Sequence, residues 1–247
     1  MEFPLGLFGW NFAAQNLTST SFAQATLTNA DLTDAMVVNA SFPPGLVKDQ
    51  LYSTASYKAK RLDGITLTGD LSNWDFSAQS LFKARLPGVM LTGANLAHVN
   101  LAQVDLSAAN LSNVRLIGAN LAETSLLSAT LTNADFPDAT VAASNLAYAA
   151  SFTKDQLYST ASYRNKDLHG VTLSYTDLSG WSFAGQKLAN ASFDFANLSG
   201  ADFSRADLTG AVLAESFDIY RTQRAVANAD LQCAKREHVR RCLIQVQ

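Results

Sequence analysis

The sequence is poor in cysteine, and it contains no long apolar run. Only 2 of its 247 residues are cysteines, Cys233 and Cys242, and both lie near the C-terminus. They form neither a CxxC motif nor a metal-binding set, and a disulfide between them would require this nine-residue spacing to fold back, so free thiols are expected. No stretch approaches the roughly 18 consecutive apolar residues of a transmembrane helix, which argues against membrane insertion.

Charge of either sign is also scarce. Charged residues make up 16% of the chain and the formal net charge is −3, which is too small to imply a nucleic acid or a membrane surface as a partner. The first residues, Met1 to Pro4, lack the basic segment and the cleavage site of a signal peptide. A cytoplasmic location is therefore expected.

No constellation of residues points to catalysis. The histidines His98, His169 and His238 are far apart, and none has a carboxylate and a nucleophile at a recognisable spacing. There is no P-loop, no GxGxxG motif and no HExxH motif. Several carboxylates occupy a repeat position where Asn also occurs: Asp105, Asp135, Asp202 and Asp207. We therefore assign no catalytic, cofactor-binding or metal-ligating residue, expect no cofactor, and predict that the protein is not an enzyme.

What the sequence has in abundance is one short repeat. Over most of its length every fifth residue is Leu or Phe, as in residues 94–108, ANLAH VNLAQ VDLSA. This period matches neither an α-helix nor a flat strand and is typical of a solenoid. The large residue and the small residue two positions before it should point inward. Gly two positions after the large residue, at the end of the repeat, should permit the backbone geometry of a corner. These central residues should be buried: Phe76, Leu96, Leu116, Phe136, Phe183, Phe193, Phe203 and Leu208.

The repeat resembles the A(D/N)LXX motif of the pentapeptide-repeat family, most clearly in residues 196–210, ANLSG ADFSR ADLTG. The resemblance implies an all-β fold, a right-handed quadrilateral parallel β-helix. In that solenoid five residues form one side, four repeats form one coil, and the central residues stack in ladders. The repeats occur in three runs, centred on residues 7–42, 62–146 and 168–213.

A longer repeat is superimposed on the short one. The segment KDQLYSTASY occurs at residues 48–57 and again at 154–163, and it breaks the period of five. We predict a short helix in each copy, with a capping box at Thr153 and Gln156 and a weaker cap at Val47. Leu51 and Ala55, and likewise Leu157 and Ala161, should share a helical face. Each helix is interpreted as a plug that covers core between solenoid segments; the alternative is a recognition element on the side of the rod.

Two details of the longer repeat carry further expectations. The first copy is one residue short between Leu67 and Leu71, which should shift a corner or force a bulge. Residues 7–15 resemble residues 178–186, so the chain begins partway through another long unit and its N-terminus looks truncated.

The expected organisation is one solenoid and a tail. Residues 1–216 form the β-helix, with helical inserts near 47–58 and 153–164, and residues 217–247 form a C-terminal tail. Asn228 to Arg236 could open a helix, with a modest stripe at Leu231, Ala234, His238 and Cys242. The tail is interpreted as a cap on the last coil, as a partly disordered basic end, or as an interface, for example of a homodimer formed through the C-terminal end.

The predicted function is a non-catalytic structural or protein–protein interaction scaffold with an unknown protein partner. The alternative that the family resemblance brings is a DNA-mimic inhibitor of a DNA-binding enzyme such as gyrase, which would need a negative stripe. With four repeats per coil, one face carries mixed residues: Asp75, Asn95, Arg115 and Asp135. A second face is equally mixed: Arg85, Asp105, Ser125 and Asn145. This pattern argues against mimicry.

Overall fold

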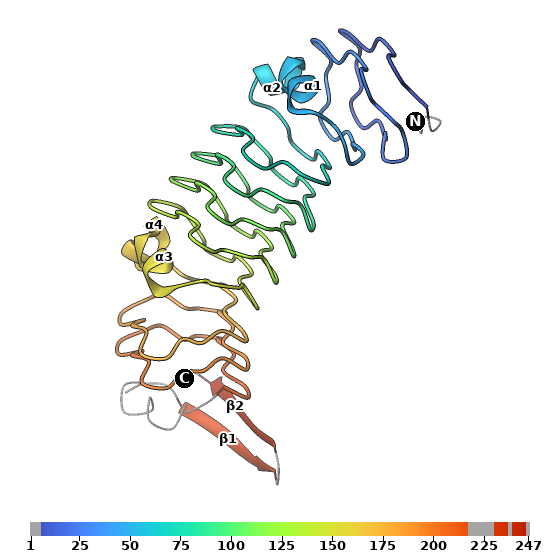
Figure 1. Cartoon of the computed structure of the whole chain (residues 1–247). Coiled ribbons are helices and arrows are strands. Elements are labelled where there is room, and N and C mark those ends of the chain that lie inside the picture. Colours follow the sequence, from blue (N-terminus) through green and yellow to red (C-terminus); the bar gives the residue numbers. More distant parts are fainter. Residues whose placement is uncertain (1–5, 217–229, 237–238, 246–247) are drawn as a thin grey trace.

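The protein is a curved rod of stacked coils (Figure 1). The computed structural model describes residues 6–216, 230–236 and 239–245. The N-terminal coils lie at one end of the rod, and the coils that end at residue 216 lie at the other. Helices α1 and α2 and, further along, α3 and α4 protrude from the same side of the rod. None of the described helices is long and apolar enough to cross a bilayer.

Neighbouring coils are held together by single-residue parallel bridges. Asp75 pairs with Asn95, which pairs with Arg115, so equivalent positions in the regular part of the rod lie 20 residues apart. That interval corresponds to four pentapeptides per coil. In the regular part of the rod, central residues also donate their N–H groups to the next coil, as Leu96 does to the Arg115 carbonyl at 2.8 Å. Each coil thus provides the hydrogen-bonding partner of the next.

The inward residues form one continuous core along the rod. All eight central residues named above are buried, which confirms that part of the prediction. The small residues between them, such as Ala94 and Val99, are buried as well. Near the C-terminal coils the core becomes aromatic, and Phe183 stacks on Phe203 with ring centroids 5.0 Å apart. Such ring pairs add about 0.5–1.5 kcal/mol each beyond the area that they bury.

The corners are tight turns that require a positive φ. In the turn after Leu96, the Val99 N–H donates to the Leu96 carbonyl at 3.3 Å and His98 has φ 56°. A positive φ at the third residue is the requirement of a type II turn. The corner glycines expected from the sequence adopt this conformation, for example Gly88 at 63° and Gly118 at 64°.

Each helical insert consists of two helices rather than the single helix that we predicted. The first insert contains α1 (Lys48–Ser53) and α2 (Ala55–Lys58), and the second contains α3 (Lys154–Ser159) and α4 (Ala161–Arg164). The break lies at Thr54, which is extended at φ −66° and ψ 148°. Its hydroxyl accepts the Tyr57 N–H at 3.1 Å and so caps a new helix. Leu51 and Ala55 therefore do not share one helical face, and that prediction is wrong.

The two inserts also begin as the cap residues predict. The Thr153 hydroxyl accepts the Gln156 N–H at 3.3 Å, and the Gln156 side chain accepts the Thr153 N–H at 2.9 Å. In the first copy the Gln50 side chain accepts the Val47 N–H at 3.1 Å. Val47 has no side-chain oxygen, so it cannot accept the Gln50 N–H in turn. The capping box at α3 and the weaker cap at α1 are both confirmed.

The missing residue after Leu67 shortens one coil. Thr66 bridges to Arg85, whereas the equivalent Thr172 bridges to Ser192, one residue further along the chain. The shortened corner is made at Gly69, which adopts φ 90° in place of the ordinary turn. The expected shift of a corner is thus confirmed.

The C-terminal segment contains a hairpin, not the helix that was expected from residue 228. Strand β1 (Asp230–Arg236) pairs antiparallel with β2 (Val239–Gln245). Two seven-residue segments with two residues between them have the spacing of a tight hairpin, and this pairing overrides the weak helical stripe. Cys233 lies opposite Cys242 in the register, which supplies the fold-back that a disulfide would need. His238 and residues 217–229 lie outside the described residues, and a domain boundary at residue 216 stays a prediction.

Candidate interaction surface

The outward residues form rows that follow the length of the rod. Parallel bridges join the first predicted row in order: Asp75, Asn95, Arg115 and Asp135. They join the second row likewise: Arg85, Asp105, Ser125 and Asn145. Both rows have the composition expected from the sequence, so neither of these two faces carries a continuous line of negative charge.

The outward faces of the rod form its walls, and polar side chains in these walls are held by hydrogen bonds within the protein. The Asn100 side chain accepts the Ala102 N–H at 3.2 Å, and the Asp105 carboxylate accepts the Ser107 N–H at 3.0 Å. These are Asx turns, in which a side chain satisfies the backbone two residues later. Other side chains bond from coil to coil, as Asn120 donates to Asn100 at 3.1 Å. The walls are therefore rigid and largely pre-ordered.

The same hydrogen bonds tune the wall carboxylates. The Ser204 N–H donates to Asp202 at 2.9 Å and holds the pKa of that carboxyl below its usual value. The Thr209 hydroxyl donates to Asp207 at 2.6 Å and lowers the pKa of Asp207 in the same way. A lowered pKa keeps both groups ionised at neutral pH, so they act as hydrogen-bond acceptors rather than as proton donors.

The structure does not bring the described histidines together. His98 lies over the backbone of Gly118, where an added Cβ would be 2.5 Å from the imidazole Nδ1. His169 contacts Asp167 at 2.7 Å on the surface. Within the described part of the chain, no three His, Cys, Asp or Glu residues are grouped to hold a metal ion. That this protein has no catalytic, cofactor or metal residue remains a prediction.

The two helical inserts are fastened to the coil that precedes them. The Gln50 amide donates to the carbonyls of Leu27 and Ala30 at 2.7 and 2.9 Å, at a corner of the earlier coil. Gln156 makes the corresponding bonds from α3, both at 2.9 Å. Leu51, which belongs to α1, is fully buried. The inserts thus cover core, while their outer surfaces face solvent.

A pair of stacked tyrosines joins each insert to the coil that follows it. In the first copy the rings of Tyr52 and Tyr57 stack with centroids 4.2 Å apart. Tyr57 donates its hydroxyl hydrogen to the Asp75 carbonyl, and Tyr52 accepts the Asp75 N–H, both at 2.5 Å. In the second copy Tyr158 and Tyr163 bond to Ser182 in the same way, at 2.6 and 2.8 Å.

The second tyrosine of each pair is kept in the neutral form. Burial and the neighbouring Tyr158 hydroxyl raise the pKa of Tyr163 to about 12. Burial and the Tyr52 hydroxyl raise the pKa of Tyr57 well above its usual value. Both phenols therefore remain protonated at neutral pH and act as structural hydrogen-bond donors.

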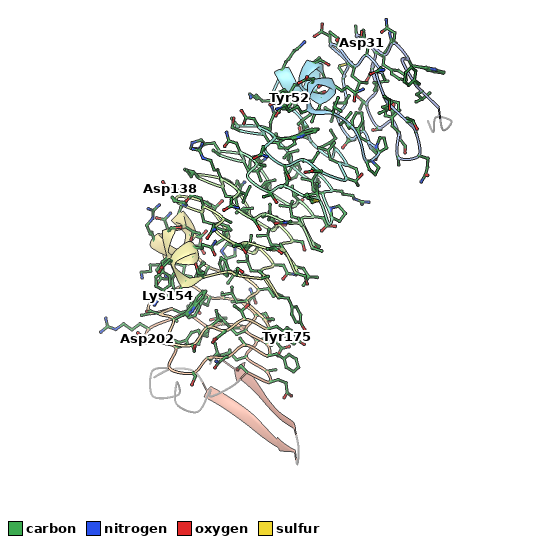
Figure 2. All side chains as sticks on the ribbon, in the orientation of Figure 1. Asp31, Tyr52, Asp138, Lys154, Tyr175 and Asp202 are labelled. Carbon is green, nitrogen blue, oxygen red and sulfur yellow. The ribbon has the colours of Figure 1, made fainter. Side chains whose placement is uncertain are left out.

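A ladder of exposed aromatic rings follows one corner of the later coils, and the sequence analysis missed it. Tyr148, Tyr175 and Phe195 are 51%, 45% and 41% exposed. Tyr148 stacks on Tyr175 at 4.1 Å between centroids, and Tyr175 stacks on Phe195 at 4.7 Å. Figure 2 shows Tyr175 at the edge of the rod opposite α3, where Lys154 is labelled. The signal in the sequence is hidden because the second insert separates Tyr148 from Tyr175.

A small groove lies beside α2, where the first insert interrupts the wall. It has a volume of about 320 Å³. Its lining is mostly apolar and includes one cation: Thr18, Met36, Val38, Ala55, Ser56, Ala59 and Arg61. This groove, too, was not anticipated from the sequence.

The family model for pentapeptide repeats matches this chain in eight copies, over residues 10–42, 70–107, 109–146 and 182–214. No curated protein matches the sequence significantly.

Several solved structures are similar to this chain. One is HetL from the cyanobacterium Nostoc sp. strain PCC 7120, a pentapeptide repeat protein involved in heterocyst differentiation regulation. HetL is 26% identical to this chain, and the match covers 84% of this chain and 89% of HetL with a TM-score of 0.32. AT2G44920, from the Arabidopsis thaliana thylakoid lumen, is 24% identical over 56% of this chain and 67% of its own, with a TM-score of 0.22. Full-length QnrB1, a plasmid-mediated fluoroquinolone resistance protein, is 15% identical over 92% and 98%, with a TM-score of 0.30.

Proposed function

This chain belongs to the pentapeptide repeat family, and we propose that it is a non-catalytic protein-interaction scaffold built as a right-handed quadrilateral β-helix. The partner binds to the side of the rod and is a protein. The rod contributes shape and fixed polar groups, and it carries out no chemical step.

The observation that carries this proposal is the state of the wall side chains. They are engaged in Asx turns and in ladders between coils, such as the bond from Asn95 to Asp75 at 3.0 Å. Side chains held in this way lose little further conformational entropy when a partner binds, which favours association. Lowered carboxyl pKa values, as at Asp202 and Asp207, keep these groups ionised and make them weak general acids or bases at neutral pH.

The mixed charge of the two faces argues against the DNA-mimic alternative. Arg115 lies between Asn95 and Asp135 in one row, and Arg85 bridges to Asp105 in another. A protein that occupies a DNA-binding site must present the regular negative charge of the phosphate backbone. Alternation of both signs favours a protein partner with its own mixed charges.

A scan of the four faces tests the scaffold. Four single variants each place one arginine on a different row: Asn95→Arg, Asn100→Arg, Asn110→Arg and Ser125→Arg. The full chain is used to capture proteins from the native cell, and each captured protein is then purified and its affinity measured against the four variants. We expect one variant to weaken binding at least tenfold and the others to bind as the parent does, while circular dichroism shows that all four remain folded. A partner that binds all four variants equally, or the discovery of turnover that one polar substitution abolishes, would contradict the proposal.

A further inference from the structure

One corner of the rod carries all three residues of the exposed aromatic ladder. Backbone hydrogen bonds connect each turn of this corner to the next: the Ser128 N–H donates to Ala147, the Tyr148 N–H to Ser174, and the Tyr175 N–H to Asp194. The corner residues in order are Ser128, Tyr148, Tyr175, Phe195 and Glu215. Aromatic residues thus occupy three consecutive layers, with one polar residue at each end.

These rings occupy a backbone conformation that suits glycine. Tyr148, Tyr175 and Phe195 have φ values of 56°, 61° and 56°. Gly88 makes the same corner in an earlier coil with φ 63°, and an added Cβ there would meet nothing within 4 Å. Positive φ recurs at corners throughout the described rod, for example at Lys83, but among the described non-glycine residues with positive φ only these three are Tyr or Phe. The core does not account for them, because about half of each ring is exposed to solvent.

Two further exposed apolar side chains lie in layers next to the ladder. Leu127, which precedes the corner residue Ser128, is 37% exposed, and Val212 on the adjoining face is 38% exposed. Val212 bridges to Ser192, three residues before Phe195. An exposed stack of tyrosine and phenylalanine rings is typical of a protein interface.

We infer that a second copy of this chain docks antiparallel against the ladder. Layers of a β-solenoid are about 4.8 Å apart, so the rings of a second copy have the same spacing as the rings that they would contact. In a two-fold dimer with its axis beside Tyr175, each Tyr175 faces its own symmetry mate. Tyr148 of one copy then lies opposite Phe195 of the other.

Charge supports this register. The antiparallel arrangement sets Glu215 opposite Ser128, a hydroxyl donor, and not opposite another carboxylate. On the adjoining face, Asn145 of one copy lies opposite Ser192 of the other, and the two copies of Thr172 face each other. These pairs can form hydrogen bonds without like-charge repulsion. A second copy is favoured over a different protein because the patch is complementary to itself. This inference rests on the proposed scaffold function, of which it specifies one partner.

Sedimentation velocity of the full chain tests the dimer. We expect the parent protein to change from monomer to dimer as its concentration rises through the micromolar range. Tyr175→Lys and Tyr175→Glu each place two like charges beside the two-fold axis, so each variant alone should remain monomeric. An equimolar mixture of the two should dimerise, because lysine then faces glutamate. Restoration by mixing identifies a symmetric contact at Tyr175 and is not expected from non-specific apolar association.

Matched variants separate the interface from folding. Tyr175→Gly fits the corner backbone, as Gly88 does, and should be folded but monomeric. Lys83→Gly changes a corner residue with φ 58° on another edge and should still dimerise. Met36→Lys removes an exposed apolar side chain far from the ladder and should also dimerise.

A parent protein that stays monomeric, or single charged variants that still dimerise, would overturn the inference. So would a mixture of the lysine and glutamate variants that fails to associate. None of these results would affect the face scan above, which measures binding of a different protein to the four walls.

Discussion

The Tyr52 hydroxyl accepts the N–H of Asp75 at 2.5 Å, and this contact replaces a backbone partner that the preceding coil cannot supply. In the regular rod, the residue that follows Asp75 in its row, Asn95, donates its N–H to the Trp74 carbonyl. One layer before Asp75 the chain forms α1 and α2 in place of a coil, so no such carbonyl is available. The Tyr57 hydroxyl donates to the Asp75 carbonyl at 2.5 Å, and the two phenols together substitute for one peptide group of a coil.

Removal of the Tyr52 hydroxyl should therefore destabilise the rod. In Tyr52→Phe the exposed Asp75 N–H loses this acceptor, and the net loss of one such hydrogen bond costs about 0.5–1.5 kcal/mol. Urea unfolding should show this loss as a lower midpoint with an unchanged slope. Met90→Leu, a change at an exposed side chain outside the inserts and the aromatic ladder, is the control and should change stability by less than about 0.5 kcal/mol. Equal stability of the parent and Tyr52→Phe would show that the contact does not replace a backbone bond.

The raised phenol pKa values predict a loss of stability in alkali. The pKa of Tyr163 is about 12 in the folded protein, against about 10 in the unfolded chain. Because the folded pKa is the higher one, the stabilisation is fully present below pH 10 and is lost as the pH rises towards 12. Tyrosinate absorbance should show late-titrating phenols, and the midpoint of urea unfolding should fall over the same range. A Tyr57→Phe, Tyr163→Phe double variant that keeps the full dependence would contradict this assignment.

Much of this fold follows from the period of five. Once Leu96 and Leu116 are placed in one ladder, the burial of the core, the corner at Gly118 and the row from Asp75 to Asp135 all follow from counting. Sequence reasoning failed where side-chain hydrogen bonds override the local pattern. Thr54 looks like an ordinary residue of a helical segment, but its hydroxyl caps Tyr57 and the next N–H, that of Ala55, donates to the Ala35 carbonyl of the preceding coil.

The exposed ladder was missed for a different reason. Tyr148 and Tyr175 belong to consecutive layers, but the α3 and α4 insert lies between them in the sequence. Their separation therefore does not match the coil length of 20 residues seen elsewhere. Only the register around the insert aligns them. The tail hairpin was missed because cross-strand pairing, as between Cys233 and Cys242, depends on contacts that local propensity does not report.

A charge in the core should be incompatible with the rod. Leu116 is fully buried between layers, so Leu116→Asp places a carboxylate among apolar side chains without a partner, at a cost of several kcal/mol. We expect the variant to unfold or aggregate when its circular dichroism and solubility are measured. Arg115→Asp, the adjacent outward position, should fold as the parent does. An unchanged melting temperature for Leu116→Asp would disprove the inward placement of the central residues.

The protein should not inhibit supercoiling by gyrase. Duplex DNA carries one negative charge for about each 1.7 Å of its length, so a mimic with layers about 4.8 Å apart needs roughly three negative charges per coil. This chain has a formal net charge of −3 in total, and Arg115 interrupts the row that contains Asp75 and Asp135. Purified protein should therefore leave the supercoiling rate unchanged at micromolar concentration. Inhibition that is lost when Asp135 and Asp202 are reversed to lysine would instead establish a DNA mimic, because such sensitivity requires these two carboxylates to contact the DNA-binding surface of the enzyme.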